Sequence, residues 1–237
     1  MPSDTARYGL YFAPSSESSL WKKGCAWLGR DAGTGQVLPQ PTSENLAGEN
    51  IATATAAPRR YGFHATLKPP FHLAKGRTAE DLQQAVEAFC RMRRPFETSP
   101  LAVQSLGNFV VLRPRVPSAA VNKLAADCVR VFDHFRLLPK TGELQNRRNK
   151  GLSERQEALL NEWGYPYVME EFRFHLTLTG SFPENVRSIY QQTLQDIFAA
   201  DCRMNMRVDG LTVFKQPEPD APFLIDQRYP FLGDTLN

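Results

Sequence analysis

The chain has 237 residues, of which 42% are hydrophobic and 22% are charged, a composition typical of a globular protein that buries its own core. Its formal net charge of +3 is too small to indicate binding to duplex nucleic acid, although it favours a phosphorylated substrate. No stretch approaches the roughly 18 apolar residues of a membrane span, and the first residues lack the basic and apolar regions of a secretion signal. We therefore expect a cytoplasmic protein with no membrane partner.

The first part of the chain predicts a strand, a helix and a long loop. Residues 7–13 alternate between apolar and polar side chains, as in a half-buried strand, and Ser15 offers an N-cap for a helix to about residue 28. Residues 31–58 are rich in Gly, Pro, Thr and Ala. We expect mostly loop there, with a short helix around 43–55, and loops of this length are often functional.

Two further blocks follow, each led by an alternating strand. The first strand covers residues 61–68 and ends at Pro69-Pro70, which we expect to stop ladder pairing. A helix then covers about 78–92, followed by two strands in 96–115, a helix at 118–137, a polar and basic segment at 140–152 and a helix at 153–163. The second strand covers 172–179, and after it we expect a helix at 184–200 and strands near 203–215 and 222–229.

This order is a weak internal repeat, because a helix and two strands follow each leading strand. Short turns between neighbouring strands favour antiparallel sheets. We therefore predict an α+β fold in one bilobal domain, residues 1–237. Two mostly antiparallel sheets would form a central cleft, with helices outside, and each repeat would contribute one leading strand to that cleft.

The two leading strands carry the same motif, His-x-Thr. It consists of His64 and Thr66 in YGFHATLK, and of His175 and Thr177 in FRFHLTLT. Because successive side chains of a strand point to opposite faces, each His shares a face with its Thr, opposite the apolar residues. Two such strands that face one another would bring two imidazoles and two hydroxyls together.

Paired histidines suit the chemistry of phosphodiesters. One group must take a proton from the nucleophile and another must give one to the leaving oxygen, and histidine titrates near neutrality. Hydroxyl groups can stabilise the charge on the phosphoryl oxygens. We predict that His64 and His175 are general base and general acid, in an order that stays open, and that Thr66 and Thr177 assist them. Such a site needs no metal and no other cofactor, and the four scattered cysteines have no metal-ligand spacing.

The paired motifs resemble those of the 2H phosphoesterases, a superfamily that includes RNA 2′,5′-ligase-like proteins and cyclic phosphodiesterases. The longer strings RYGFHATLKPPF and GYPYVMEEFRFHLTLTG are similar to a bacterial branch associated with phosphonate metabolism, and the similarity extends to YFAP near the start. The resemblance implies a pseudo-symmetric 2H phosphoesterase-like fold. It also implies a metal-independent phosphodiesterase for a small cyclic phosphate or nucleotide-like diester, such as a ribosyl 1,2-cyclic phosphate or a nucleoside 2′,3′-cyclic phosphate.

Other residues are candidates for substrate contact because they share the polar faces or lead into the motifs. By period-two counting, Lys68 and Arg173 lie on the histidine faces, where they could bind phosphate. The alternative is that each is a solvated cation at a strand edge. The basic run 147–150 is a candidate for a second, terminal phosphate. The full set of individual candidates is Tyr11, Arg60, Tyr61, Lys68, Tyr167 and Arg173.

Two other functions remain open. An enzyme that processes RNA ends would need a basic, aromatic-lined groove beyond the histidines, which the small net charge disfavours. A non-catalytic module that binds a phosphorylated metabolite would have no use for two proton-transfer groups. The oligomeric state is not predicted.

Overall fold

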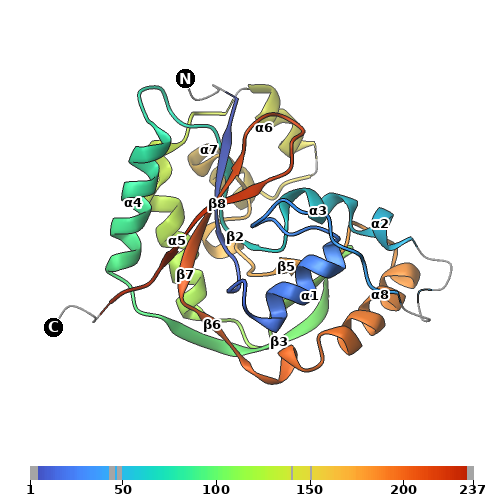
Figure 1. Ribbon diagram of the computed structural model, residues 1–237. Helices are drawn as coiled ribbons and strands as arrows, with labels where there is room; N and C mark the ends of the chain where they lie inside the picture. Colours follow the sequence, from blue (N-terminus) through green and yellow to red (C-terminus); the bar gives the residue numbers. More distant parts are fainter. Residues whose placement is uncertain (1–4, 43–45, 47–49, 140, 150, 234–237) are drawn as a thin grey trace.

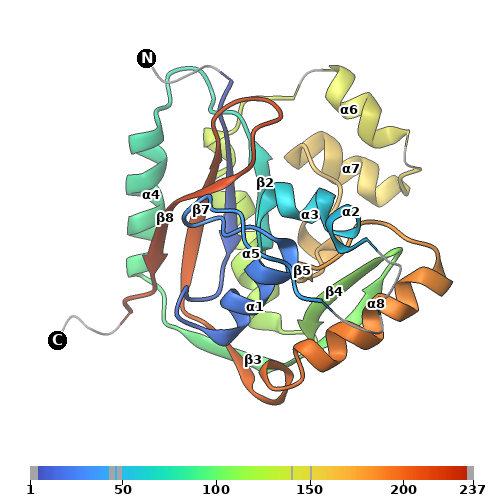
Figure 2. The ribbon, with the colours of Figure 1, turned by 45° about the vertical axis from the view of Figure 1, so that its right-hand side comes forward.

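The computed structural model describes residues 5–42, 46, 50–139, 141–149 and 151–233. Within these residues, eight strands form one curled antiparallel sheet in the order β6-β3-β4-β5-β2-β1-β7-β8 (Figures 1 and 2). The strands are β1 Arg7–Phe12, β2 Ala65–Phe71, β3 Phe96–Leu106, β4 Phe109–Pro114, β5 Leu176–Thr177, β6 Asn205–Val208, β7 Gly210–Gln216 and β8 Leu224–Pro230.

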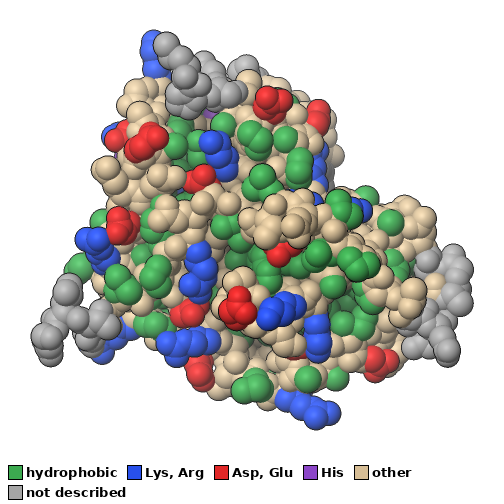
Figure 3. Space-filling view, in the orientation of Figure 1, with side chains coloured by type: hydrophobic (Ala, Val, Ile, Leu, Met, Phe, Trp, Pro, Cys, Tyr) green, Lys and Arg blue, Asp and Glu red, His purple; other side chains and the backbone are tan. Residues whose placement is uncertain are grey.

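Helices pack against the sheet along most of its length. In the described part of the chain, α4 packs on β7 and β8, α5 on β2, and α8 on β3 and β4. Figure 3 shows one face of the molecule, where Lys and Arg side chains are interspersed with Asp and Glu and do not gather in one patch. The helices are α1 Ser19–Leu28, α2 Ile51–Ala54, α3 Ala56–Tyr61, α4 Ala79–Arg91, α5 Ala119–Val131, α6 Thr141–Arg148, α7 Glu154–Trp163 and α8 Glu184–Ile197.

The predicted α+β class with antiparallel strands is confirmed, and the strand order adds a detail that the repeat did not reveal. The two motif strands, β2 and β5, are neighbours in the middle of the sheet. Strands β3 and β4 follow β2 in the chain but lie beside β5, whereas β7 and β8 follow β5 but lie on the β2 side. The two expected sheets are therefore joined edge to edge, and each half combines strands from both predicted repeats.

Local capping chemistry explains the helix boundaries. At α4, Thr78 and Asp81 form a reciprocal capping box, and Ser153 and Gln156 do the same at α7. Helix α1 begins later than predicted, because its N-cap is Ser18, whose hydroxyl accepts from the Trp21 amide. Of the helix expected at 43–55, residues 43–45 and 47–49 lie outside the described residues. The segment expected to be polar and basic, 140–152, contains α6.

The first motif is approached differently from the prediction. Tyr61 is the last residue of α3 and not the first of a strand, and the helix ends at Gly62, whose φ of 83° is in the region that favours glycine. Regular β2 pairing begins at Ala65. His64 therefore lies in the extended link between a helix end and a strand.

Pro69 and Pro70 do not end the strand, contrary to expectation. They lie within β2, at an irregularity in its pairing with β1. On the other side, β5 pairs with β2 only at Ala65, so no neighbouring strand needs an N–H there. Proline is tolerated in a strand under these conditions.

Candidate active site

The alternation predicted for the two motifs is present in the structure. Alternate residues of each motif segment are buried, with exposed fractions of at most 8%, and belong to the main hydrophobic core. They are Phe63, Ala65, Leu67, Phe172, Phe174, Leu176 and Leu178. The His and Thr of each motif are partly exposed. Regular strand geometry at the second motif is shorter than predicted, covering only Leu176–Thr177.

The two motifs lie directly against one another. Strands β2 and β5 pair through the middle residues of the motifs, Ala65 and Leu176. When this antiparallel register is extended by one residue on each side, the His of each motif lies opposite the Thr of the other. Directly opposite Cβ atoms are ~4.5–5.5 Å apart and diagonal neighbours ~7–8 Å, so His64 and His175 are diagonal neighbours on one face.

Both imidazoles are held in the same orientation by the backbone. The Nδ1 atom of His64 lies 2.9 Å from the Gly62 carbonyl oxygen, and that of His175 lies 2.6 Å from the Arg173 carbonyl oxygen. Because a carbonyl only accepts, each Nδ1 must be the donor, which leaves Nε2 unprotonated in the neutral ring. The Thr66 hydroxyl lies 3.2 Å from Nε2 of His64. The unprotonated Nε2 of His64 accepts from this hydroxyl, and His175 repeats the tautomer of His64.

Burial keeps both imidazoles neutral near pH 7. Desolvation lowers the pKa of His64 to about 4, opposed by the Gly62 carbonyl and reinforced by the charge of His175. Desolvation also lowers the pKa of His175, opposed by the Arg173 carbonyl and reinforced by the charge of Arg113. Each histidine is thus poised to accept a proton, and an anion between them would favour the protonated forms.

Tyr11 of β1 forms one wall of the His64 site. Its ring stacks on the imidazole, with centroids 3.9 Å apart and an interplanar angle of 22°. The ring also lies close to Gly9, where a Cβ atom would be only 2.5 Å from the ring and 2.7 Å from the hydroxyl. The side chain is fully buried, and its hydroxyl has no hydrogen-bond partner among the described residues. Burial raises the pKa of Tyr11 well above its usual value.

Arg60 and Tyr61 lie near the first motif in different ways. Tyr61 stacks on Phe223 with centroids 5.1 Å apart, and its ring centroid is 6.3 Å from that of His64. The Arg60 guanidinium is ion-paired with Asp220 at 3.0 Å. The structure therefore brings Tyr61 toward the histidine, whereas Arg60 has a carboxylate partner in the loop before β8.

The tyrosines before the second motif differ in their distance from the histidine pair. Tyr167 is 43% exposed and contacts Tyr165 edge to face, with centroids 5.7 Å apart. It is Tyr165, outside the substrate-binding set predicted from sequence, that interacts electrostatically with Tyr11 and Tyr61. Tyr165 is therefore the nearer of the two to the His64 wall.

Lys68 is not on the histidine face, and its predicted contact with substrate is not supported. In the pairing with β1, Tyr11 lies opposite Thr66 but Leu10 lies opposite Lys68, so Leu67 is the extra residue of a β-bulge. A bulge shifts the following side chains to the other face. Lys68 consequently points toward α5, where it is 2% exposed and ion-paired with Asp133 at 3.1 Å.

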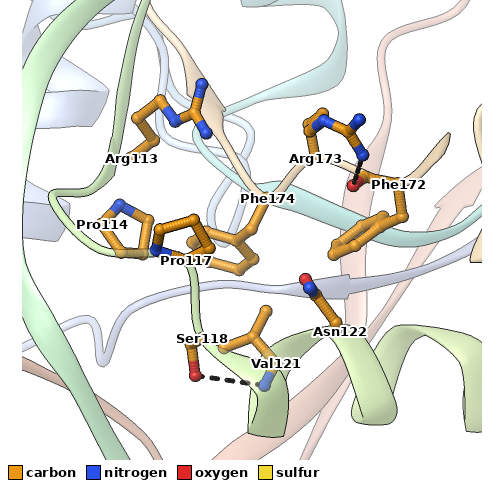
Figure 4. Close-up of a pocket in the computed structure, with 9 residues that line it drawn as sticks. All are labelled: Arg113, Pro114, Pro117, Ser118, Val121, Asn122, Phe172, Arg173 and Phe174. Carbon is orange, nitrogen blue, oxygen red and sulfur yellow. Dashed lines mark hydrogen bonds between the residues drawn. The ribbon is translucent and has the colours of Figure 1, made fainter. Parts of the chain in front are cut away.

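Arg113 is a site residue that the sequence prediction missed. Leu112 pairs with Leu176, so the next position of the register sets Arg113 opposite His175. Arg113 and Arg173 line a cavity of about 170 Å³, and Figure 4 shows both guanidinium groups at the end of this cavity away from Ser118. The sequence feature that could have identified Arg113 is its position as a single cation within the otherwise apolar strand FVVLRP.

The two arginines differ in their freedom to bind an anion. Arg173 is exposed and donates to the carbonyl oxygens of Glu170 and Phe172 at 2.6 and 2.8 Å. Within the described residues, the Arg113 guanidinium has no hydrogen-bond or ion-pair partner. Arg113 is therefore the stronger candidate for an anion beside His175.

Several features bear on cofactors and compartment. Among the residues that the structure describes, no group of three or more His, Cys, Asp or Glu side chains could hold a metal ion. The four cysteines, all in the described ranges, are free and buried. None of the helices in the described ranges is both long and apolar enough to cross a membrane.

The fold and site define an antiparallel α+β protein that presents two His-x-Thr motifs on adjacent central strands. Residues 66–224 match the family model described as "Protein of unknown function (DUF1045)". Because the match covers more than half of the chain, the chain belongs to this family.

Two relatives share substantial sequence identity with the chain. They are the proteins named "Ribose 1,5-bisphosphate phosphokinase PhnN" of Janthinobacterium sp. (strain Marseille) and Laribacter hongkongensis (strain HLHK9). The first is 37% identical over 231 residues, which are 96% of this chain and 51% of the relative. The second is 34% identical over 218 residues, which are 92% of this chain and 50% of the relative. The chain spans about half the length of the relatives it matches.

Two solved structures resemble the fold more distantly. One is the crystal structure of E. coli LigT complexed with 3'-AMP, with a TM-score of 0.41, 12% identity and coverage of 98% of this chain and 99% of LigT. The other is a crystal structure of a phosphoesterase, with a TM-score of 0.40, 12% identity and coverage of 96% and 98%. Similarity at this level does not identify an activity.

Proposed function

We propose that this protein is a phosphoesterase that opens a small cyclic phosphate by proton transfer between His64 and His175. The observation that carries the proposal is the matched presentation of two Nε2 atoms on adjacent strands, each fixed by a hydrogen bond from Nδ1 to the backbone. The whole chain would act as one bilobal unit, because the two motifs come from strands on opposite halves of the sheet.

The proposed reaction is a hydrolysis. His64 is assigned as the general base, because its pKa of about 4 leaves Nε2 free to accept a proton at physiological pH. It takes a proton from water as the water oxygen bonds to phosphorus. His175, protonated beside the bound phosphate anion, gives its Nε2 proton to the ring oxygen as the P–O bond breaks, which yields a phosphate monoester and a free hydroxyl.

The remaining site residues would stabilise the charge on phosphorus. Thr66 and Thr177 lie opposite the two histidines in the extended register and would donate their hydroxyls to phosphoryl oxygens. Arg113 would place a positive charge beside the same oxygens. No step of this scheme requires a metal ion, and we propose that the enzyme is metal-independent.

The substrate class is proposed from the family resemblance and from the names of the relatives. Those relatives are named for ribose 1,5-bisphosphate, a sugar with two phosphates, which supports a ribosyl phosphate and a role in phosphonate metabolism. The small formal net charge of +3 favours a small ligand over an extended nucleic acid. We also propose a cytoplasmic location, which the free cysteines support.

The kinase activity in the relatives' name is not part of the proposal. That name belongs to proteins about twice as long as this chain. The phosphate-binding string G-x-x-x-x-G-K-[ST] of P-loop kinases does not occur in this sequence.

The test is an assay of metal-stripped protein with a panel of cyclic phosphates. The panel contains ribosyl 1,2-cyclic phosphate, nucleoside 2′,3′-cyclic phosphates and an oligoribonucleotide with a cyclic phosphate end. We expect His64→Ala and His175→Ala each to lower kcat by about 10²–10⁴-fold, with no such loss in His134→Ala, a histidine in the short segment after α5. Activity that disappears on chelation, or that persists in both variants, would overturn the mechanism.

A further inference from the structure

A second, larger cavity lies at the end of the sheet where β1 begins. It has a volume of about 530 Å³ and is lined by three arginines, Arg7, Arg136 and Arg147, together with His72 and other polar and apolar residues. We call it the arginine cavity. The proposed chemistry at the histidine pair makes no use of it.

Two of the three cations are available to an anion. The Arg136 guanidinium is neutralised by Asp133, to which it donates two hydrogen bonds of 2.8 and 3.0 Å. Arg7 donates only its Nε–H, to Gln216 at 2.7 Å, and Arg147 lies over the Tyr165 ring at 4.7 Å. Within the described residues, neither Arg7 nor Arg147 forms an ion pair.

The surrounding charge also favours an anion. The lining of the arginine cavity includes one carboxylate, the exposed Glu143 of α6. Against this carboxylate stand the guanidinium groups of Arg7 and Arg147. The His72 ring, whose Nδ1 lies 3.0 Å from the Ala6 carbonyl oxygen, adds a polar side chain to the lining. A partly enclosed cavity with excess positive charge attracts anionic groups.

Tyr11 lies on the same strand as Arg7 of the arginine cavity, and its ring stacks on the His64 imidazole. Arg7, Gly9 and Tyr11 alternate along β1 and share one face, and four residues of strand span about 13 Å. Because the Tyr11 hydroxyl lies over Gly9, it points back along the strand toward Arg7. The two groups are close enough that the charge of Arg7 opposes the rise in the pKa of Tyr11. In the part of the chain that the structure describes, this buried hydroxyl has no hydrogen-bond partner, although a buried hydroxyl ordinarily has one.

We propose that the arginine cavity binds a second phosphate group, a monoester, of the same molecule whose cyclic phosphate lies between the histidines. The proposal rests on the proposed function and narrows the substrate class to a compact sugar with a phosphate at each end. The guanidinium forks of Arg7 and Arg147 match phosphate oxygens.

The decisive measurement compares substrates that differ only in the second phosphate. Adenosine 2′,3′-cyclic phosphate and ribosyl 1,2-cyclic phosphate are each assayed with and without a phosphate on the 5-position. Where a pair of compounds is hydrolysed, we expect the member that carries the additional 5-phosphate to have the higher kcat/KM. In Arg147→Gln, and separately in Arg7→Gln, this preference should fall about 10-fold to 100-fold, as for the loss of a charged hydrogen bond.

The matched control is the neighbouring arginine of the same helix. Arg148 is ion-paired with Glu157 at 2.7 Å and is not among the residues that line the arginine cavity. Arg148→Gln should keep the preference of the parent. The proposal would be overturned if the kcat/KM ratio between substrates with and without the 5-phosphate were the same in the parent and in Arg147→Gln. It would also be overturned if Arg147→Gln and Arg148→Gln lowered this ratio equally.

A binding experiment separates this proposal from the proposed hydrolysis. Ribose 5-phosphate, which has no cyclic phosphate, is titrated calorimetrically into the double variant His64→Ala/His175→Ala. We expect binding that is about 10-fold weaker when Arg147→Gln is added and unchanged when Arg148→Gln is added. Such binding would support the second-phosphate site even if no cyclic phosphate were hydrolysed, whereas no binding, or binding insensitive to Arg147→Gln, would refute it even if hydrolysis occurred.

Discussion

A single methyl group added at Gly9 should disable the His64 site. A Cβ atom at this position would be 2.5 Å from the Tyr11 ring, whereas ordinary contacts begin at 3.4 Å. The ring would have to move by about 1 Å, and in a packed interior this movement disturbs its stacking on the imidazole. Gly9→Ala therefore displaces Tyr11 and, through it, His64.

The magnitude follows from the two consequences of this displacement. Overpacking of this kind costs about 1–3 kcal/mol of stability, offset by the ~0.4–1 kcal/mol that a Gly→Ala change contributes through the unfolded chain. We expect Gly9→Ala to lower the free energy of unfolding by about 1–2 kcal/mol. A misplacement of about 1 Å at a reacting group should lower kcat/KM by up to ~10²-fold.

The assay is a double-mutant cycle measured by urea unfolding and by kcat/KM. It compares the parent with Gly9→Ala, Tyr11→Ala and the double variant, and uses Gly142→Ala as a control, since a Cβ there would contact nothing within 4 Å. If the clash with Tyr11 is the cause, Gly9→Ala should cost almost nothing in the Tyr11→Ala background. An equal cost in both backgrounds would refute the reasoning.

Three further predictions concern the charges around the site. Because the pKa of His64 is about 4 in the fold and 6.5 otherwise, the unfolded chain binds more protons between these values. The free energy of unfolding should therefore decrease by about 2 kcal/mol from pH 7 to pH 5. His64→Gln should reduce this slope in urea unfolding measured at each pH, and an identical slope would contradict the assignment. Arg113→Gln should lower kcat/KM by roughly 10²-fold, and Arg113→Lys should restore part of this loss. Because the charge of Arg113 lowers the pKa of His175, Arg113→Gln should also shift the alkaline limb of the pH–rate profile to higher pH. A profile that does not move would argue against the place of Arg113 beside His175. Lys68→Met should leave KM unchanged, and a raised KM in this variant would restore Lys68 as a substrate contact. Asp133→Asn should destabilise the protein by about 1–3 kcal/mol, because it leaves the buried Lys68 ammonium without its carboxylate.

Local sequence was sufficient for the features that depend on neighbouring residues. Alternation in the two motifs correctly separated buried from partly exposed side chains, because strand geometry alternates whatever lies around it. The capping residues Thr78 and Ser153 marked two helix starts for a similarly local reason. The repeat of strand, helix and two strands also predicted the fold class.

Only the tertiary structure decided what lies opposite each residue. The bulge at Leu67 moved Lys68 off the face that period-two counting assigned to it, because counting assumes an uninterrupted ladder. Arg113 met His175 through the pairing of β4 with β5, two strands more than sixty residues apart in the chain, and no local pattern contains that register.

What the sequence by itself determined about this protein is therefore the content of each strand face: an imidazole and a hydroxyl on one side and core residues on the other. Which faces meet was decided by long-range strand pairing, which sets the two motifs side by side and adds Tyr11 and Arg113 to their flanks. The physical reason is that side-chain direction depends on neighbouring backbone dihedrals, whereas pairing partners depend on how the whole core packs.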